Sequence, residues 1–186
     1  MNAEIDISKV TLTTDRLILR PWRTGDIDDL YEYASVDGVG QPAGWLPHKS
    51  RDESREILSL FIAEKSTFAI EYGGKVTGSL GIDRYNEEEF PEFRGLLGRE
   101  IGYVLSRDCW GRGLMPEAVN AAVTYLFDKV ELDFILCCHA FSNSRSRRVQ
   151  EKCGFKHYRT FKYTTSFGEV RDSWASLMRR TDAPAV

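Results

Sequence analysis

The chain has 186 residues, of which 42% are hydrophobic and 28% charged, with a formal net charge of -3. This composition is that of a folded protein, and we expect residues 1–186 to form one domain with tails at 1–14 and 181–186. The mild acidity excludes the basic surface typical of nucleic-acid binding. The sequence has neither an apolar run of about 18 residues for a membrane span nor a signal-peptide pattern, so we expect a cytoplasmic protein that binds no membrane.

Four cysteines occur, Cys109, Cys137, Cys138 and Cys153, and there are only three histidines. No two cysteines have the Cys-x-x-Cys spacing, so the pattern predicts neither a metal site nor a disulfide framework. We interpret the cysteines as small buried residues of a reducing compartment. A covalent acyl-cysteine mechanism is the alternative.

The N-terminal half mixes strand and helix patterns. Arg16–Pro21 predicts a strand, and Thr24–Ala34 predicts a helix because a capping residue precedes apolar residues at helical spacing. Ser50–Glu53 is a capping box that begins a second helix. Phe68–Tyr72 and Val76–Ile82, separated by two glycines, predict a β-hairpin.

In the C-terminal half we expect the acidic segment Asn86–Phe93 to be an exposed loop, with attraction of a cationic amine as the alternative. The remaining pattern predicts strands, a helix, a further short helix capped by Asn143, and a final hairpin. The expected elements are a strand at Glu100–Leu105, a helix at Ala118–Lys129, a buried strand at Phe134–Phe141, and hairpin strands at His157–Thr165 and Val170–Met178.

The segment between the strand ending at Leu105 and the following helix contains a glycine turn. Gly111 and Gly113 allow positive φ and a close approach of the backbone to a ligand. Pro116 suits the first helical position, and Glu117 favours the positive end of the helix dipole. The unpaired N–H groups of such a helix start bind phosphate or pyrophosphate, although a plain tight turn is the alternative. Neither a P-loop nor a dinucleotide fingerprint is complete here.

Two motifs resemble the GNAT family of acyl-CoA N-acyltransferases. Trp110–Met115 is similar to the family's pyrophosphate motif, with Trp110 and Met115 departing from its strict ends. Asn143–Phe155 resembles the family's Asn-x-x-Ser-x-x-Val-x-Glu-Lys-x-Gly-Phe segment. The first motif is closest in form to the branch of ribosomal-protein alanine N-acetyltransferases (RimJ/RimL-like).

The resemblance implies an α/β (α+β) fold: a mixed, mostly antiparallel seven-stranded sheet flanked by about four helices. In that fold the fourth and fifth strands splay apart and admit the pantetheine arm of the coenzyme. It also implies a set of coenzyme contacts from strand backbone, glycine turn and one polar side chain. The cofactor-binding residues expected from this resemblance are Tyr103, Val104, Leu105, Gly111, Arg112, Gly113, Leu114, Met115 and Asn143.

Acyl transfer to an amine needs a base for the amine and a proton for the leaving thiolate. We expect Ser146 to be the acid, with a serine that only bonds local backbone as the alternative. Glu100 is the expected base, acting directly or through a water molecule, and an exposed strand-end glutamate is the alternative. Cys138 occupies another base position of the family and suits that work poorly. His139 is interpreted as a hydrogen-bonded core residue rather than a catalyst.

Two further groups of residues have open roles. Arg145, Arg147 and Arg148 form a basic cluster that either meets the 3′-phosphate of CoA or is a solvated helix face. Three aromatic residues either wall the acceptor pocket or belong to the core, namely Trp45, Tyr85 and Trp174.

The resemblance therefore implies an acetyl-CoA-dependent N-acetyltransferase, with acetyl-CoA as cosubstrate and direct attack by a primary amine in a ternary complex. A protein N-terminus and a small-molecule amine both stay open as acceptors. The alternatives are a non-catalytic acyl-CoA-binding or sensing module and a nucleotide-binding protein that uses the same turn. Monomer and homodimer are both open.

Overall fold

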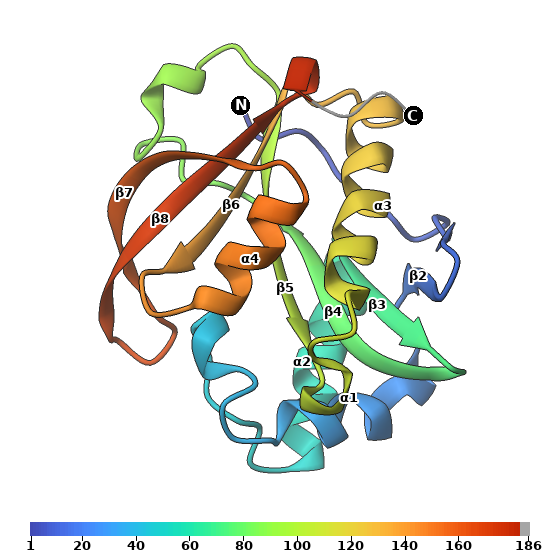
Figure 1. Cartoon of the computed structure of the whole chain (residues 1–186). Coiled ribbons are helices and arrows are strands. Elements are labelled where there is room, and N and C mark those ends of the chain that lie inside the picture. The colour runs from blue at the N-terminus through green and yellow to red at the C-terminus, as the bar shows by residue number, and fades with distance from the viewer. Residues whose placement is uncertain (183–186) are drawn as a thin grey trace.

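A single mixed sheet organises the computed structural model, which describes residues 1–182 (Figure 1). Part of the tail expected at 181–186 therefore lies outside the described residues. The sheet has eight strands in the order β1-β2-β3-β4-β5-β6-β8-β7. Neighbouring strands are antiparallel except β5 and β6, which are parallel. The strands are β1 (Leu12–Thr13), β2 (Leu17–Pro21), β3 (Thr67–Tyr72), β4 (Lys75–Asp83), β5 (Gly98–Leu105), β6 (Phe134–Ala140), β7 (Lys156–Thr164) and β8 (Val170–Arg179).

The predicted fold class is confirmed, but the sheet has one strand more than the seven expected. The additional strand is β1, in which Leu12 and Thr13 pair with Leu19 and Ile18 of β2. The expected fourth and fifth strands are therefore β5 and β6. A two-residue strand has too short a pattern to be recognised from alternation of apolar and polar residues.

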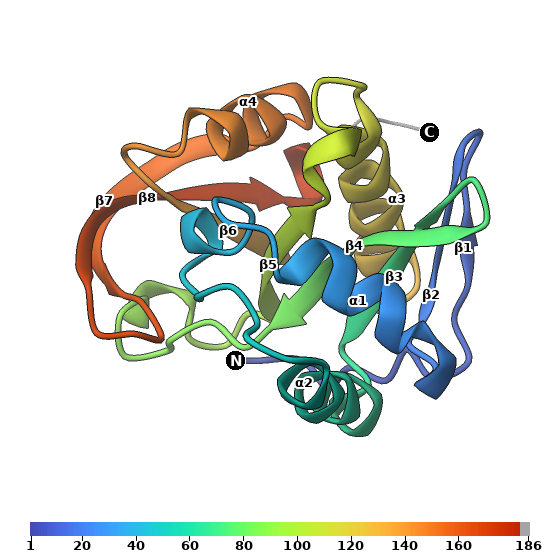
Figure 2. The same ribbon diagram turned by 90° about the horizontal axis from the view of Figure 1, so that it is seen from below.

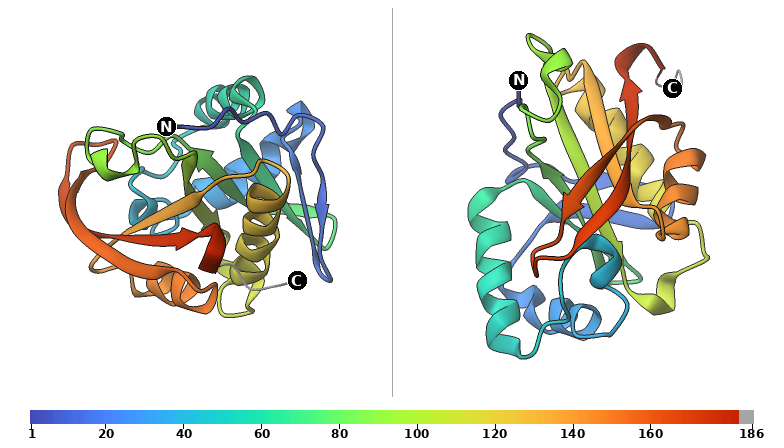
Figure 3. Two further views of the ribbon diagram at one scale, coloured as in Figure 1. Left: turned by 90° about the horizontal axis from the view of Figure 1, so that it is seen from above. Right: turned by 90° about the vertical axis from the view of Figure 1, so that its left-hand side faces the viewer.

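Four α-helices cover the sheet in two layers (Figures 2 and 3). They are α1 (Ile27–Ala34), α2 (Arg51–Glu64), α3 (Leu114–Asp128) and α4 (Ser144–Lys152). Helices α1 and α2 lie on one face, and α3 and α4 lie on the other. Within residues 1–182, none of the helices is both long and apolar enough to cross a membrane.

Buried side chains form a core on each face of the sheet. Ile82 and Ile101 pack with Leu126 of α3 in the larger core. Trp22 of the loop after β2 packs with Leu58 of α2 in the core on the other face. Because strand side chains alternate between faces, neighbouring residues of β5 enter different cores.

The acidic segment at 86–93 is not simply an exposed loop. Phe90 and Phe93 are 3% and 1% exposed and belong to a third core with Phe134. Arg159 of β7 forms an ion pair with Glu89, at 3.1 Å. The segment therefore buries its apolar residues, while its acidic residues stay exposed beside β7.

The strands β5 and β6 part after a short stretch of pairing. Their register joins Gly98 with Phe134, Arg99 with Ile135 and Glu100 with Leu136, and ends there. Beyond this point β5 remains paired with β4 as far as Leu105, and β6 remains paired with β8 as far as Ala140. The predicted splaying of these strands is therefore confirmed.

Gly98 marks the closed end of this gap. A Cβ atom at this position would lie 2.1 Å from the Phe134 ring, which is itself fully buried. We predict that Gly98→Ala lowers the free energy of unfolding by about 1–3 kcal/mol through overpacking, as measured by denaturant unfolding. Gly25→Ala is the matched control, because nothing lies within 4 Å of its Cβ position. Equal stability of the two variants would contradict the role assigned to Gly98.

Candidate functional site

A cavity of about 520 Å³ occupies the gap between β5 and β6. It extends from the glycine turn before α3, through the parted strands, to the end of β4. All of the predicted site residues line it except Arg112. The lining residues that the sequence predicted are Glu100, Tyr103, Val104, Leu105, Gly111, Gly113, Leu114, Met115, Asn143 and Ser146.

The glycine turn has the backbone conformation that its sequence predicts. Gly111 and Gly113 have φ of 76° and 75°, in the left-handed region where glycine is favoured. Helix α3 begins at Leu114, so Pro116 is its third residue. The prediction that Pro116 takes the first helical position is therefore wrong. The first N–H groups of a helix have no partner within it. The start of α3 therefore presents backbone N–H donors at one end of the cavity.

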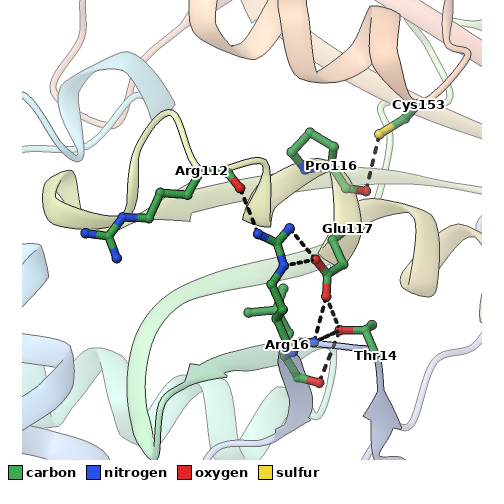
Figure 4. A network of polar contacts seen from close by, with 7 residues as sticks. Thr14, Arg16, Arg112, Pro116, Glu117 and Cys153 are labelled. Carbon is green, nitrogen blue, oxygen red and sulfur yellow. Dashed lines mark hydrogen bonds and ion pairs between the residues drawn. The ribbon is translucent and has the colours of Figure 1, made fainter.

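A tether from the turn between β1 and β2 holds this helix start in place (Figure 4). Arg16 donates from Nε to Glu117 at 2.7 Å and from Nη1 to the carbonyl of Arg112 at 2.9 Å. Thr14 donates from its hydroxyl to the same Glu117 carboxylate. Although burial opposes it, these hydrogen bonds lower the pKa of Glu117 below its ordinary value. Arg112 thus contributes its carbonyl to the turn, while its side chain lies outside the cavity lining.

The other end of the cavity carries two carboxylates on paired strands. Asp83 of β4 and Glu100 of β5 are directly opposite in register, and both line the cavity. Burial, with a smaller contribution from the charge of Asp83, raises the pKa of Glu100 to about 7, although a hydrogen bond with Cys138 opposes the shift. Burial and the nearby charge of Glu64 raise the pKa of Asp83 as well. Glu100 is therefore not the freely exposed strand-end residue of the alternative interpretation.

A chain of hydrogen bonds on the α3–α4 side of the gap holds Ser146. The Ser146 hydroxyl lies 3.0 Å from the Tyr103 phenol and accepts from the Gln150 amide at 3.2 Å. Gln150 Oε1 lies 2.9 Å from Nδ1 of His139. His139 is thus a buried, hydrogen-bonded residue, and burial lowers its pKa.

Asn143 and Ser146 are also joined at the start of α4. Asn143 accepts from the backbone N–H of Ser146 at 3.1 Å and donates to the carbonyl of Pro42 at 3.3 Å. Asn143 therefore caps α4 as its sequence predicts. The Ser146 side chain is not used in that cap, so its hydroxyl bonds to side chains that line the gap.

The cysteine thiols of the cavity are poor nucleophiles. Burial, with the nearby Glu100 carboxylate, raises the pKa of both Cys137 and Cys138 far above the ordinary value. Since the thiolate is the reactive form, the alternative of an acyl-cysteine intermediate is disfavoured. In residues 1–182, no group of three or more His, Cys, Asp or Glu side chains is arranged to hold a metal ion.

The residues with open roles divide between the cavity and other places. Arg145 and Arg148 line the cavity, and the Arg145 guanidinium lies 4.0 Å from the ring centroid of Trp110. Arg147 instead forms an ion pair with Glu151. The aromatic residues Trp45, Tyr85 and Trp174 are not among the residues that line the cavity.

Sequence reasoning missed Asp83, Tyr163 and Arg171, all of which line the cavity. Asp83 ends a predicted strand, but no local pattern distinguishes it from an ordinary exposed residue. Tyr163 and Arg171 belong to β7 and β8, whose hairpin reaches over the gap only in the folded sheet (Figure 1).

A sheet whose parallel strands part beside a glycine-opened helix start is the architecture of the acyl-CoA-dependent transferases that the motifs resemble. The family model of the acetyltransferase (GNAT) domain matches residues 16–156. The chain belongs to the GNAT family and is an acetyl-CoA-dependent N-acetyltransferase, as the sequence motifs predicted.

Similar proteins include several acetyltransferases. The N-acetyltransferase p20 of Bacillus licheniformis is 29% identical over 180 residues, which are 91% of this chain and 97% of that protein. YdaF of Bacillus subtilis, provisionally named a ribosomal N-acetyltransferase, is 38% identical over 56 residues, 30% of this chain and 31% of YdaF. RimJ of Mycobacterium smegmatis, solved in complex with CoA-disulfide, is 21% identical with a TM-score of 0.78, covering 100% of this chain and 93% of that chain.

The raised pKa of Glu100 predicts a pH-dependent stability. An acid with a raised pKa in the folded state stabilises that state below its ordinary pKa and loses this contribution as the pH rises through about 7. We therefore predict that the free energy of unfolding of Glu100→Gln minus that of wild type is larger at pH 8 than at pH 5. The expected increase is roughly 1–2 kcal/mol. Denaturant unfolding at both pH values measures this difference.

The matched control for this prediction is Glu56→Gln on the exposed face of α2. It should change stability equally at the two pH values. If Glu100→Gln also shows no pH dependence, Glu100 has an ordinary pKa and the electrostatic description of this end of the cavity is wrong.

Proposed function

We propose that the protein transfers the acetyl group of acetyl-CoA directly to a primary amine while both substrates are bound. One observation carries this proposal: a single cavity joins unpaired helix N–H groups at one end to a carboxylate of raised pKa at the other. The first end suits a pyrophosphate and the second suits an ammonium group that must lose a proton.

In this proposal the coenzyme lies along the free length of β5. The pyrophosphate binds backbone N–H groups of the turn and helix start between Gly111 and Met115. The pantetheine arm hydrogen-bonds to the backbone of Tyr103, Val104 and Leu105, which have no partner on β6. Asn143 adds a polar contact. The parted strands support this placement because they leave backbone groups of β5 facing the cavity.

The proposed chemistry assigns one proton to each catalytic residue. Glu100 takes a proton from the ammonium group, and the amine nitrogen then forms a bond with the thioester carbonyl carbon. The carbon–sulfur bond breaks, and the thiolate takes a proton from the Ser146 hydroxyl. The attacking nitrogen gives up its second proton, which restores the Ser146 hydroxyl and leaves a neutral amide. Tyr103 and Gln150 hold that hydroxyl in place. The raised pKa of Glu100 suits a group that exchanges a proton near neutral pH.

A protein N-terminal amine is one proposed acceptor class, supported by the name given to YdaF. A small-molecule amine is the other. Release of CoA thiol from acetyl-CoA across a panel of peptides and small amines tests the transfer. When both substrates are varied, direct transfer predicts intersecting lines in double-reciprocal plots of the initial rate. An acyl-enzyme mechanism predicts parallel lines in the same plots. Binding of acetyl-CoA without turnover on any amine would favour an acyl-CoA-binding module.

Ser146 provides a prediction with a neighbouring control. We predict that Ser146→Ala lowers kcat by about 10²-fold, because the thiolate loses its proton donor, with a smaller change in the KM of the amine. Ser144→Ala is the control, since Ser144 is an exposed serine of the same helix. A loss of activity shared equally by both variants would indicate a general effect on α4 instead of proton transfer.

The tether at the glycine turn predicts an effect on coenzyme affinity. Arg16→Gln removes the ion pair with Glu117 and the hydrogen bond to the Arg112 carbonyl. We predict that the KM for acetyl-CoA rises about tenfold, corresponding to one lost charge-assisted interaction, while the KM of the amine changes little. Arg51→Gln, which breaks an exposed ion pair with Asp28, should leave both constants unchanged. An unaltered KM for acetyl-CoA in Arg16→Gln would contradict this role of the tether.

A further inference from the structure

The hydrogen bonds around Ser146 have a direction, and this direction decides which atom receives the hydrogen of the Ser146 hydroxyl. A hydroxyl donates one hydrogen and can accept two further hydrogen bonds. The proton transfer proposed for Ser146 requires that its hydrogen be available to the thiolate. The neighbours of Ser146 must therefore donate to its oxygen instead of accepting its hydrogen.

Gln150 is a neighbour that donates. Its side chain lies one helical turn after Ser146 on α4 and is 2% exposed. The Nε2 atom of its amide donates to Ser146 Oγ at 3.2 Å, and the Oε1 atom lies 2.9 Å from Nδ1 of His139. An amide turned the other way round would place Oε1 at Ser146, where it would accept the hydroxyl hydrogen. The orientation of this amide therefore determines whether Ser146 keeps a free hydrogen.

His139 of β6 fixes the orientation of the amide. An amide oxygen only accepts, so Nδ1 of His139 carries a hydrogen in this arrangement. The ring of His139 is buried against the indole of Trp174, with 5.7 Å between ring centroids. Burial lowers the pKa of His139, which favours the neutral ring with a single N–H. The tautomer with its hydrogen on Nε2 would accept from Gln150 at Nδ1 and so reverse the amide.

The remaining neighbour, Tyr103, leaves the hydrogen of Ser146 available. The phenol of Tyr103 lies 3.0 Å from the Ser146 hydroxyl oxygen and 3.2 Å from the carbonyl of the same residue. Its own hydrogen can be donated to either oxygen. The phenol oxygen can accept from Ser146 only as a neutral group, and a thiolate is a charged acceptor that forms a stronger hydrogen bond.

We infer that His139 is a positioning residue for the transfer: its Nδ1–H orients the Gln150 amide, and this orientation leaves the Ser146 hydroxyl free to protonate the thiolate. This inference rests on the role proposed above for Ser146. The proton that moves is that of the Ser146 hydroxyl, while His139 and Gln150 set the direction of the hydrogen bonds and transfer none. His139 thus remains a hydrogen-bonded residue that does not touch the reacting atoms.

The first test uses the wild-type protein. The nitrogen chemical shifts of an imidazole, measured by NMR, distinguish a ring protonated on Nδ1 from one protonated on Nε2. We expect neutral His139 to carry its hydrogen on Nδ1, and a sample of His139→Asn assigns its signals by their loss. A neutral ring with its hydrogen on Nε2 would overturn the inference. This measurement does not depend on the activity of any variant.

The second test compares Gln150→Glu with Gln150→Met. Both variants remove the N–H that bonds Ser146 and keep nearly the same side-chain length, but only the carboxylate can accept the Ser146 hydrogen. We expect kcat to be about tenfold lower in Gln150→Glu than in Gln150→Met, with similar KM values for acetyl-CoA and the amine. A purely structural role predicts the opposite order, because the carboxylate still accepts from His139 and methionine leaves that N–H unpaired. An equal or higher kcat in Gln150→Glu would overturn the inference.

The third test asks whether His139 acts through Gln150. His139→Asp places an acceptor where Nδ1 donates, so the amide turns and kcat should fall about tenfold. In the Gln150→Met background the same change should have no further effect, because no amide is left to turn. His157→Asp is the control: His157 is exposed and packs against the same Trp174 ring, and this variant should keep the wild-type kcat. An equal loss from His139→Asp in both backgrounds would overturn the role of Gln150.

The outcomes separate this inference from the proposed function. If Ser146→Ala keeps the wild-type kcat, Ser146 is not the acid, and both the proposed chemistry and this inference are overturned. If Ser146→Ala loses activity while Gln150→Glu is at least as active as Gln150→Met, only the positioning role is overturned. The proposed transfer by Glu100 and Ser146 then still stands.

Discussion

The separation of β5 from β6 is the constraint on which the rest of the site depends. Three residue pairs hold the strands together at one end, and each strand then continues with its outer neighbour alone. The resulting gap passes through the sheet, so groups on both faces reach one cavity. Ser146 reaches the cavity from the α3–α4 face of the sheet. The side chain of Ile101 lies on that face as well, so the side chain of the adjacent Glu100 lies on the opposite face. The proposed acid and the proposed base thus lie on opposite sides of the proposed reaction centre.

The two ends of the cavity are stabilised by different kinds of interaction. At the glycine turn, an ion pair between Arg16 and Glu117 joins residues that are 101 positions apart in the chain. At the other end, two carboxylates lack such a partner within the described residues. Arg16, a cation, is therefore fixed near the proposed binding place of an anion. The two carboxylates near the proposed binding place of the amine have no such ion pair in residues 1–182.

Much of the fold and part of the site were predictable from local patterns. The glycine turn, the Asn143 cap and the strand ending at Leu105 are each set by residues a few positions apart, and all were recognised. The third-position Pro116 and the buried Phe90 were misjudged, because helix starts and loop packing depend on tertiary contacts. Asp83 could not be recognised, since its importance comes from its register with β5. Such pairing is a property of the folded sheet, and a single sequence does not display it.

The brief ladder between β5 and β6 has a mechanical consequence. The ladder that joins strands β1–β5 to strands β6–β8 lies between Gly98 and Glu100 on one side and Phe134 and Leu136 on the other. Outside this ladder, the backbone N–H of Ser166 also donates to the carbonyl of Gly44. The five residues of β5 beyond Glu100 span about 17 Å, so a rotation of about 5° at this hinge displaces the far end by about 1.5 Å. The width of the gap at the glycine turn is therefore more sensitive to hinge geometry than its width beside Glu100.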